Sequence, residues 1–269
     1  MTSSRDTYTH GHHQSVLDSH RWRNAENSAA YLLAHLTDVA RLLDVGCGPA
    51  TLTADLARLI DPGVVTAIEP QQSVVDIAHQ GLQDAGAANV QVELGDVYNL
   101  GYANETFEVV HAHQVLQHLS APLDALKEMR RVCKSNGVVA IRDADYGTIR
   151  FWPEMPELVR WLALYFQVAE SNDAYPDAGR RLQHWANDAG FSKVAPSASV
   201  WCFATAENRA WWGGTWSQRI LSSSVATQAL ERGFADREEL QWISDGWQTW
   251  VADPNAWFNI VHGEILATP

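Results

Sequence analysis

Positive charge is the first thing that this sequence lacks. Its 269 residues include 19 lysines and arginines against 32 aspartates and glutamates, for a formal net charge of −13 at pH 7. Proteins that bind nucleic acids usually carry a dense basic surface that neutralises phosphates. The composition therefore predicts no nucleic-acid partner.

Cysteine and long apolar runs are also scarce. Cys47, Cys133 and Cys202 lie far apart and form no Cys-x-x-Cys pair, so we expect a reducing compartment and no metal or redox site. The polar first 15 residues lack the apolar core of a signal peptide, and no run approaches the ~18 apolar residues of a membrane span. These absences predict a cytoplasmic protein that is not inserted in a membrane.

Tryptophan is nearly absent from the first half of the chain and abundant in the second. Eleven of the twelve tryptophans follow residue 150, and Trp22 is the exception. Large flat side chains that gather in one half of a chain predict an aromatic-lined cavity or cap there. Packing in a core or an interface is the alternative, and the sequence favours neither.

Short apolar runs alternate with helical patterns between residues 40 and 143. This alternation is typical of repeated βα units, so it predicts a doubly wound α/β fold around a parallel sheet. The predicted strands of this region are 41–45, 64–69, 90–94, 107–113 and 138–141.

The flanking segments predict further helices and two more strands. Residues 19–36 have an amphipathic pattern, which predicts one N-terminal helix. Residues 205–252 are mostly helical in pattern, and they separate a strand at 192–204 from a last strand at 257–266. The predicted parts are an N-terminal helical segment (1–36), an α/β domain (37–204 with 253–269) and a helical cap insertion (205–252).

The sharpest local motif is the run LLDVGCGPAT at residues 42–51, which joins the first strand to a helix. Glycines serve where the backbone bends tightly and a ligand must approach it closely, which fits Gly46 and Gly48. A dinucleotide site would need a third glycine where this chain has Thr51. Asp44, just before the turn, suits a cationic ligand. The motif therefore favours a nucleoside joined to an amino acid over a diphosphate.

Two more acidic residues follow the neighbouring strands. Glu69 ends the second strand, 25 residues after Asp44, where a carboxylate can accept both hydroxyls of a ribose. Gly95 and Asp96 end the third strand, where a carboxylate can accept the amine of adenine while Val97 packs near the ring. Because open α/β sheets bind ligands at the carboxyl ends of their strands, the three acids predict one nucleoside site.

Together these pieces resemble class I S-adenosylmethionine-dependent methyltransferases, near the ubiquinone/menaquinone-biosynthesis enzymes and natural-product small-molecule methyltransferases. The matching segments lie in order within residues 41–143 and read LLDVGCGPAT, AIEP, GDVYNL, FEVVHAHQVLQHL and LKEMRRVCKSNGVVAIRD. The resemblance implies a Rossmann-like seven-stranded sheet with an antiparallel last strand. It also implies S-adenosylmethionine as cofactor and S-adenosylhomocysteine as product. One departure is Ala50, where many members carry glycine.

The resemblance extends to the residues around the donor. The N-terminal part (1–36) resembles the helical flap that closes over the donor in related enzymes, with a frayed tail as the alternative. In this family the fourth strand borders the methyl donor, so His113 or His118 could deprotonate an acceptor, or could instead cap the strand. Asp143 could hold or activate the acceptor, or belong to a salt-bridged loop. The further cofactor-binding candidates are Tyr8, Arg23, Cys47, Pro70, His113 and Gln114, and the substrate-binding candidates are His13, Gln117, Arg142, Tyr146, Trp211 and Trp212.

The sequence thus predicts in-line methyl transfer to a small acceptor. Trp211 and Trp212 stand beside two glycines, which favours an apolar or aromatic acceptor against a hydrophobic wall. Alignment alone can supply about 7–11 kcal/mol of such a barrier, so a general base is optional. A catalytically silent S-adenosylmethionine-binding protein and, with less support, a nicotinamide-dependent oxidoreductase are the alternatives. A homo-oligomer is compatible with the sequence.

Overall fold

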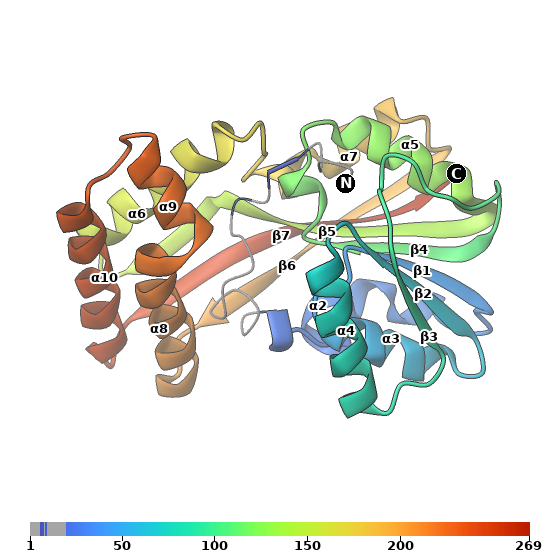
Figure 1. Ribbon diagram of the computed structural model, residues 1–269, viewed down its shortest axis with the longest axis horizontal. Coiled ribbons are helices and arrows are strands. Elements are labelled where there is room, and N and C mark those ends of the chain that lie inside the picture. The colour runs from blue at the N-terminus through green and yellow to red at the C-terminus, as the bar shows by residue number, and fades with distance from the viewer. Residues whose placement is uncertain (1–5, 8, 10–19) are drawn as a thin grey trace.

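The computed structural model describes residues 6, 7, 9 and 20–269, and a seven-stranded sheet runs through it (Figure 1). The strand order is β3-β2-β1-β4-β5-β7-β6. The first five strands of this order are parallel, and β7 runs antiparallel to both β5 and β6. The Rossmann-like prediction with an antiparallel last strand is confirmed. The strands are β1 (Arg41–Val45), β2 (Val64–Glu69), β3 (Val90–Leu94), β4 (Phe107–His113), β5 (Cys133–Trp152), β6 (Lys193–Phe203) and β7 (Trp257–Thr268).

Helices cover both faces of the sheet because successive strand residues point to opposite sides. On β1, Leu42 packs into an apolar cluster with α3, whereas Leu43 packs into a second cluster with α5 and α7. In Figure 1, α3 and α4 lie below the sheet, while α5 and α7 lie above it. These helices are α3 (Thr51–Ile60), α4 (Gln72–Ala85), α5 (Pro122–Val132) and α7 (Ala178–Asp188).

Strand β5 is much longer than the predicted strand at 138–141. It continues past its parallel partner β4 and pairs with β7 as far as Trp152 and Trp257. The charged residues that follow position 141 resemble a loop in the sequence, yet they are buried in the sheet with partners of their own. Arg142, for example, forms an ion pair with Glu264 of β7 at 3.2 Å.

The long ends of β5, β6 and β7 carry a second helical layer (Figure 1). Its core is a group of tryptophans that includes Trp161. The ring of Trp161 lies edge-on to those of Trp216 and Trp247, with ring centroids 4.6 and 5.0 Å apart. The layer consists of α6 (Pro156–Glu170), α8 (Ala206–Ser222), α9 (Ser224–Glu231) and α10 (Arg237–Ala252).

Among the described residues, no helix has both the length and the apolar character that crossing a membrane requires.

The single N-terminal helix predicted at residues 19–36 is wrong. The described part contains the short helix α2 (Ala25–Ser28) and then a 3-10 helix (Ala30–His35). A new helix begins at residue 25 because Asn24 and Asn27 each accept the other's backbone N–H with their side chains, at 2.9 Å. Such side chains compete with helix continuation and favour caps.

Candidate functional site

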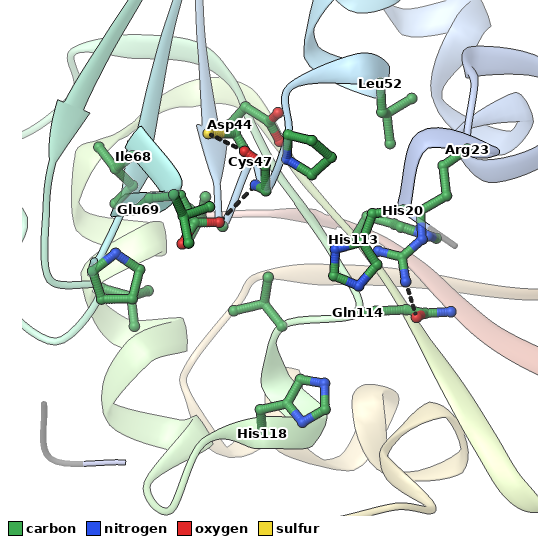
Figure 2. Close-up of a pocket in the computed structure, with 18 of the residues that line it drawn as sticks. His20, Arg23, Asp44, Cys47, Leu52, Ile68, Glu69, His113, Gln114 and His118 are labelled. Carbon is green, nitrogen blue, oxygen red and sulfur yellow. Dashed lines mark hydrogen bonds between the residues drawn. The ribbon is translucent and has the colours of Figure 1, made fainter. Parts of the chain in front are cut away.

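A cavity of about 550 Å³ opens at the carboxyl ends of the central strands and extends to the second helical layer. Its volume is in the range of small-molecule sites. Figure 2 shows Glu69 and Ile68 on one side of this cavity, with His113, Gln114 and Arg23 on the other side of the view. Strands β1 to β3 supply one end of the wall, and β5 to β7 with α8 supply the other.

The glycine turn after β1 has the backbone conformation that its sequence predicts. Gly46 and Gly48 have φ values of +71° and +56°, in the left-handed region that favours glycine. A Cβ on Gly46 would lie only 2.6 Å from a methyl carbon of Val115. The N–H groups of Gly46 and Cys47 both donate to the carbonyl of Ile68, at 2.9 and 3.3 Å, so the turn is tied to β2.

Ala50 also has a positive φ, at +60°. It stands directly before α3 and is fully buried. The departure noted in the sequence therefore falls on a position where glycine would relieve backbone strain. The alanine methyl group packs among Ala54, Ala78 and Leu82 in compensation.

Glu69 links the end of β2 to the glycine turn. Its carboxylate accepts the N–H of Gly48 at 2.6 Å, as the dashed line in Figure 2 shows. Burial raises the pKa of Glu69 to about 7, although the Gly48 bond opposes this shift. A carboxyl group poised near neutral pH can ionise when a ligand offers hydroxyl donors.

The other two acids of the motif occupy different environments. Asp44 is buried, and its carboxylate oxygens contact Thr53 Oγ1 at 2.6 Å and His111 Nδ1 at 2.7 Å. It therefore anchors the turn to α3 and β4 while it lines the cavity. Asp96 is exposed and accepts the N–H of Tyr98 at 2.9 Å. The predicted cofactor residues Pro70, Gly95 and Val97 also line this end.

Two neutral histidines face the cavity after β4. His113 ends β4, and neither of its ring nitrogens has a hydrogen-bond partner among the described residues. Burial, with the charges of Arg23 and Arg142, holds the pKa of His113 well below its usual value. Burial and Arg23 lower the pKa of His118 to about 3, and its Nε2 lies 2.9 Å from the side-chain nitrogen of Gln117. Both rings are therefore uncharged at neutral pH.

The far end of the cavity is aromatic. The predicted substrate residues Tyr146, Trp211 and Trp212 all line it. Trp211 stacks on Trp22 with ring centroids 4.9 Å apart, and Tyr146 stacks on Tyr165 at 4.2 Å. Trp22 and Tyr165 thus pack against residues of the cavity wall and stabilise their positions.

Three other candidates are not among the residues that line the cavity in the described part. Asp143 is fully buried below it and accepts the N–H of Gln117 at 3.2 Å, and burial raises the pKa of Asp143 to about 7. Gln117 itself accepts the N–H of Ala144 with its side chain. Arg142 donates to Ser199 and lies 4.8 Å over the ring of Trp201. These side chains support the site from beneath.

The structure describes only some of the N-terminal candidate residues. Tyr8 and His13 lie outside the described residues. Arg23 lines the cavity and donates to the Gln114 side chain at 2.7 Å, as Figure 2 shows. Asp6 lines it too, and its carboxylate accepts the hydroxyl of Tyr98 at 2.7 Å. The flap stays a prediction.

Several residues at the aromatic end of the cavity were not predicted from the sequence. They belong to no local motif, since β6, β7 and α8 bring them together from distant parts of the chain. One signal was available: Trp212, Trp216 and Arg219 are spaced by four and three residues, which places them on one face of a helix. The missed residues of this end include Trp201, Arg219, Ile260 and His262. His20, which lies near the glycine turn at the other end, was missed as well.

Comparison with known proteins places these features in a family. A family model described as "Methyltransferase domain" matches residues 36–222. The chain is 33% identical to an uncharacterised methyltransferase of Schizosaccharomyces pombe, over 96% of this chain and 95% of that protein. It is 28% identical to a probable methyltransferase of Aspergillus luteorubrus, over 99% and 98% of the two chains. A demethylmenaquinone methyltransferase of Staphylococcus epidermidis is 30% identical over 48% of this chain and 50% of its own length.

Solved structures share the fold. A putative sarcosine dimethylglycine methyltransferase of Galdieria sulphuraria superposes with a TM-score of 0.56 at 13% identity, over 97% of this chain and 93% of that one. A phosphoethanolamine N-methyltransferase of Haemonchus contortus, solved with S-adenosylhomocysteine, gives 0.56 at 14% identity over 95% and 57%. At such identities the likeness concerns the fold alone.

Proposed function

The chain belongs to the class I S-adenosylmethionine-dependent methyltransferases, and we propose that it methylates a small, apolar or aromatic acceptor. The observation that carries this proposal is the continuous cavity, which joins the glycine turn to the aromatic wall. A donor bound at the turn would leave the tryptophan-lined end for the acceptor.

The residues at the turn fit the cofactor. Glu69 offers a carboxylate for the ribose hydroxyls and Asp96 one for the adenine amine, and both line the cavity. Asp44 adds negative charge near the turn, which suits the positive charge of a sulfonium. When bound, S-adenosylmethionine supplies an electrophilic methyl group and becomes S-adenosylhomocysteine.

His113 is the base that the geometry favours. It lies in the cavity wall at the end of β4, and neither of its ring nitrogens has a hydrogen-bond partner among the described residues, so one is available to accept a proton. An acceptor oxygen or nitrogen would form the bond to the methyl carbon with its lone pair, while the sulfur keeps the electrons of the broken bond. The acceptor's proton would pass to His113 and then to water. His118 and Asp143, the other candidates, are held by Gln117.

A transfer assay with methyl-labelled S-adenosylmethionine tests the proposal. We expect label to enter small aromatic hydroxyl or amino compounds but not sugars or unstructured peptides. With the first acceptor found, His113→Gln should lower kcat by about 10²–10⁴ and leave the Kd for S-adenosylhomocysteine within a few-fold. His184→Gln is the matched control, because His184 is an exposed residue of α7 outside the cavity. Label found only in sugars or peptides would refute the proposed acceptor class.

A further inference from the structure

We infer that His262 selects acceptors that carry a carbonyl oxygen, which it binds through the N–H of its Nδ1 atom. This inference rests on the proposed function, since it specifies the acceptor class of the same site. His262 lies on β7 in the wall of the cavity, and only 1% of the residue is exposed. The hydrogen bonds around its ring determine which nitrogen carries the hydrogen.

Gln114 connects Arg23 to the ring of His262. Its side-chain oxygen accepts an N–H of Arg23 at 2.7 Å, as Figure 2 shows, and its side-chain nitrogen lies 2.8 Å from Nε2 of His262. A guanidinium can only donate, so the amide oxygen must face Arg23 and the amide nitrogen must face the imidazole. The orientation of the Gln114 amide is therefore determined.

The backbone of Gln114 is held in an uncommon conformation. Its φ is +55°, in the left-handed region that residues other than glycine rarely adopt. Its backbone N–H donates to the carbonyl of Arg142 at 2.7 Å, which ties this conformation to β5. Strained residues of this kind cluster at functional sites, where the surrounding structure maintains them. The side chain of Gln114 is thus directed by a fixed backbone.

The imidazole of His262 carries a single hydrogen, and that hydrogen is on Nδ1. Burial, with the charges of Arg142 and Arg23, holds the pKa of His262 well below its usual value, so the ring is uncharged at neutral pH. Because the Gln114 amide donates to Nε2, this nitrogen must be the one without a hydrogen. His262 therefore has an N–H donor at Nδ1.

This Nδ1 donor has no hydrogen-bond partner among the described residues. The carbonyl of Ile260 raises the pKa of His262, which favours a hydrogen on the ring, but it forms no hydrogen bond with Nδ1. A buried donor without a partner costs free energy, and an oxygen of a ligand would remove that cost. A carbonyl oxygen accepts such a bond without bringing a charge into the buried wall.

The position of His262 assigns this donor to the acceptor and not to the cofactor. In the strand order β1-β4-β5-β7, β7 is the third strand from the one that precedes the glycine turn. Neighbouring strands lie about 4.8 Å apart, so β7 lies roughly 14 Å from β1. The ring of His262 packs instead against Trp201 of β6, with ring centroids 4.2 Å apart. The same indole lies 6.0 Å from the ring of His113, so the donor and the proposed base belong to one part of the wall.

The test compares phenols that differ only in a carbonyl oxygen. The pairs are 4-hydroxyacetophenone against 4-ethylphenol, and 6-hydroxy-1-tetralone against 6-hydroxytetralin. Each is titrated by calorimetry into protein saturated with S-adenosylhomocysteine at pH 6.5, where the phenols are uncharged. The quantity compared among variants is the ratio of the two Kd values within a pair.

Two substitutions distinguish the ring nitrogens of His262. The amide nitrogen of asparagine takes the place of Nδ1, and that of glutamine takes the place of Nε2. We expect at least one ketone to bind the unmodified protein. His262→Gln should weaken this ketone about tenfold relative to its alkyl analogue, because the donor at Nδ1 is lost. His262→Asn should keep the ratio within about threefold of the wild type, because that donor remains.

The control variant is His184→Gln, which makes the same change at an exposed histidine of α7 outside the cavity and should keep the wild-type ratio. Absence of S-adenosylhomocysteine binding to the unmodified protein would contradict the methyltransferase site itself. Intact cofactor binding without binding of either ketone overturns only the present inference. The same holds if His262→Gln weakens ketone and alkyl analogue equally, or if His262→Asn loses as much as His262→Gln.

Nitrogen-15 NMR of the unmodified protein, labelled in its histidines, locates the hydrogen without any substitution and so stays decisive if a variant fails to fold. After assignment of His262, we expect an uncharged ring with its hydrogen on Nδ1. Addition of the ketone that binds should shift this N–H signal, and its alkyl analogue should not. A hydrogen on Nε2, or an N–H signal that the ketone leaves unchanged, overturns the inference.

Discussion

Glu69→Gln should make the cofactor-free protein more stable above neutral pH and weaken its hold on the cofactor. Glu69 is 9% exposed, and its carboxyl accepts one hydrogen bond, from the Gly48 N–H. Burial raises its pKa from 4.5 to about 7. The folded protein therefore binds more protons at this group than the unfolded chain between pH 4.5 and pH 7.

The sign and size of the effect follow from this difference. The free energy of unfolding falls as pH rises wherever the folded state holds the extra proton. A difference of about 2.5 pKa units corresponds to about 3 kcal/mol, lost between pH 4.5 and 7 and constant above. Glutamine is neutral throughout and can still accept the Gly48 N–H. Relative to wild type, Glu69→Gln should thus gain about 3 kcal/mol on going from pH 4.5 to pH 8.

Cofactor affinity should change in the opposite direction. An ionised carboxylate accepts ribose hydroxyls more strongly than an amide does, so Glu69→Gln should lose about 2 kcal/mol of binding, roughly 30-fold. In the wild type, affinity for S-adenosylhomocysteine should rise with pH up to about 7, since the carboxyl must ionise to bind both hydroxyls.

Urea denaturation and calorimetry from pH 4.5 to 8 measure the two effects. Glu154→Gln, at an exposed position between β5 and α6, is the control and should follow the wild type in both. If Glu69→Gln keeps the wild-type pH dependence of stability, Glu69 is already ionised in the folded protein and the reasoning fails.

Three further predictions concern single positions. Gly46→Asp should abolish calorimetric binding of S-adenosylhomocysteine, because the position has φ +71° and its Cβ would meet Val115 at 2.6 Å; heat like that of the wild type would contradict the turn's role. Asp96→Ala should weaken this binding by about 1–3 kcal/mol through one lost hydrogen-bonded carboxylate, and an unchanged Kd would remove Asp96 from the site. Arg142→Met should destabilise the fold by about 3–5 kcal/mol in urea, because it leaves Glu264 as a buried charge, and adding Glu264→Met should recover much of the loss.

Most of the sheet could be predicted from the sequence because its central strands are short apolar runs that end at turns. The predicted bounds of β1 to β4 equal those of the structure. Of strand β5, only residues 138–141 were predicted, since Arg142, Asp143 and Asp145, which follow them, have the charge of a loop. Arg142 and Asp145 are buried because partners within the fold neutralise them: Glu264 pairs with Arg142, and Arg180 with Asp145. Such pairing joins distant residues and leaves no local pattern.

The two ends of the cavity also differ in how far local sequence patterns predict them. The cofactor end is formed by residues just after successive strands, so a motif of neighbouring residues reveals it. At the acceptor end, strand alternation decides which residues of β5 face the cavity: Ala144 and Tyr146 line it, whereas Asp143 points away. His262 reaches the wall because its register on β7 places it opposite Ala144. Composition and spacing predict neither the register between β5 and β7 nor which alternate residues of β5 face the cavity.

The tryptophans divide between the two interpretations that the sequence left open, a packed core and a cavity wall. This division explains how the aromatic wall of the cavity is supported. Trp161, Trp216, Trp247 and Trp250 are fully buried in the second helical layer, while Trp212 lines the cavity. Trp212 contacts this core directly, with its ring centroid 6.1 Å from that of Trp216. Because closely packed aromatic rings leave little room to shift, the wall has a defined shape before any acceptor arrives. A rigid wall selects acceptors by fit, so changes in this core should alter acceptor choice while the cofactor end stays as it is.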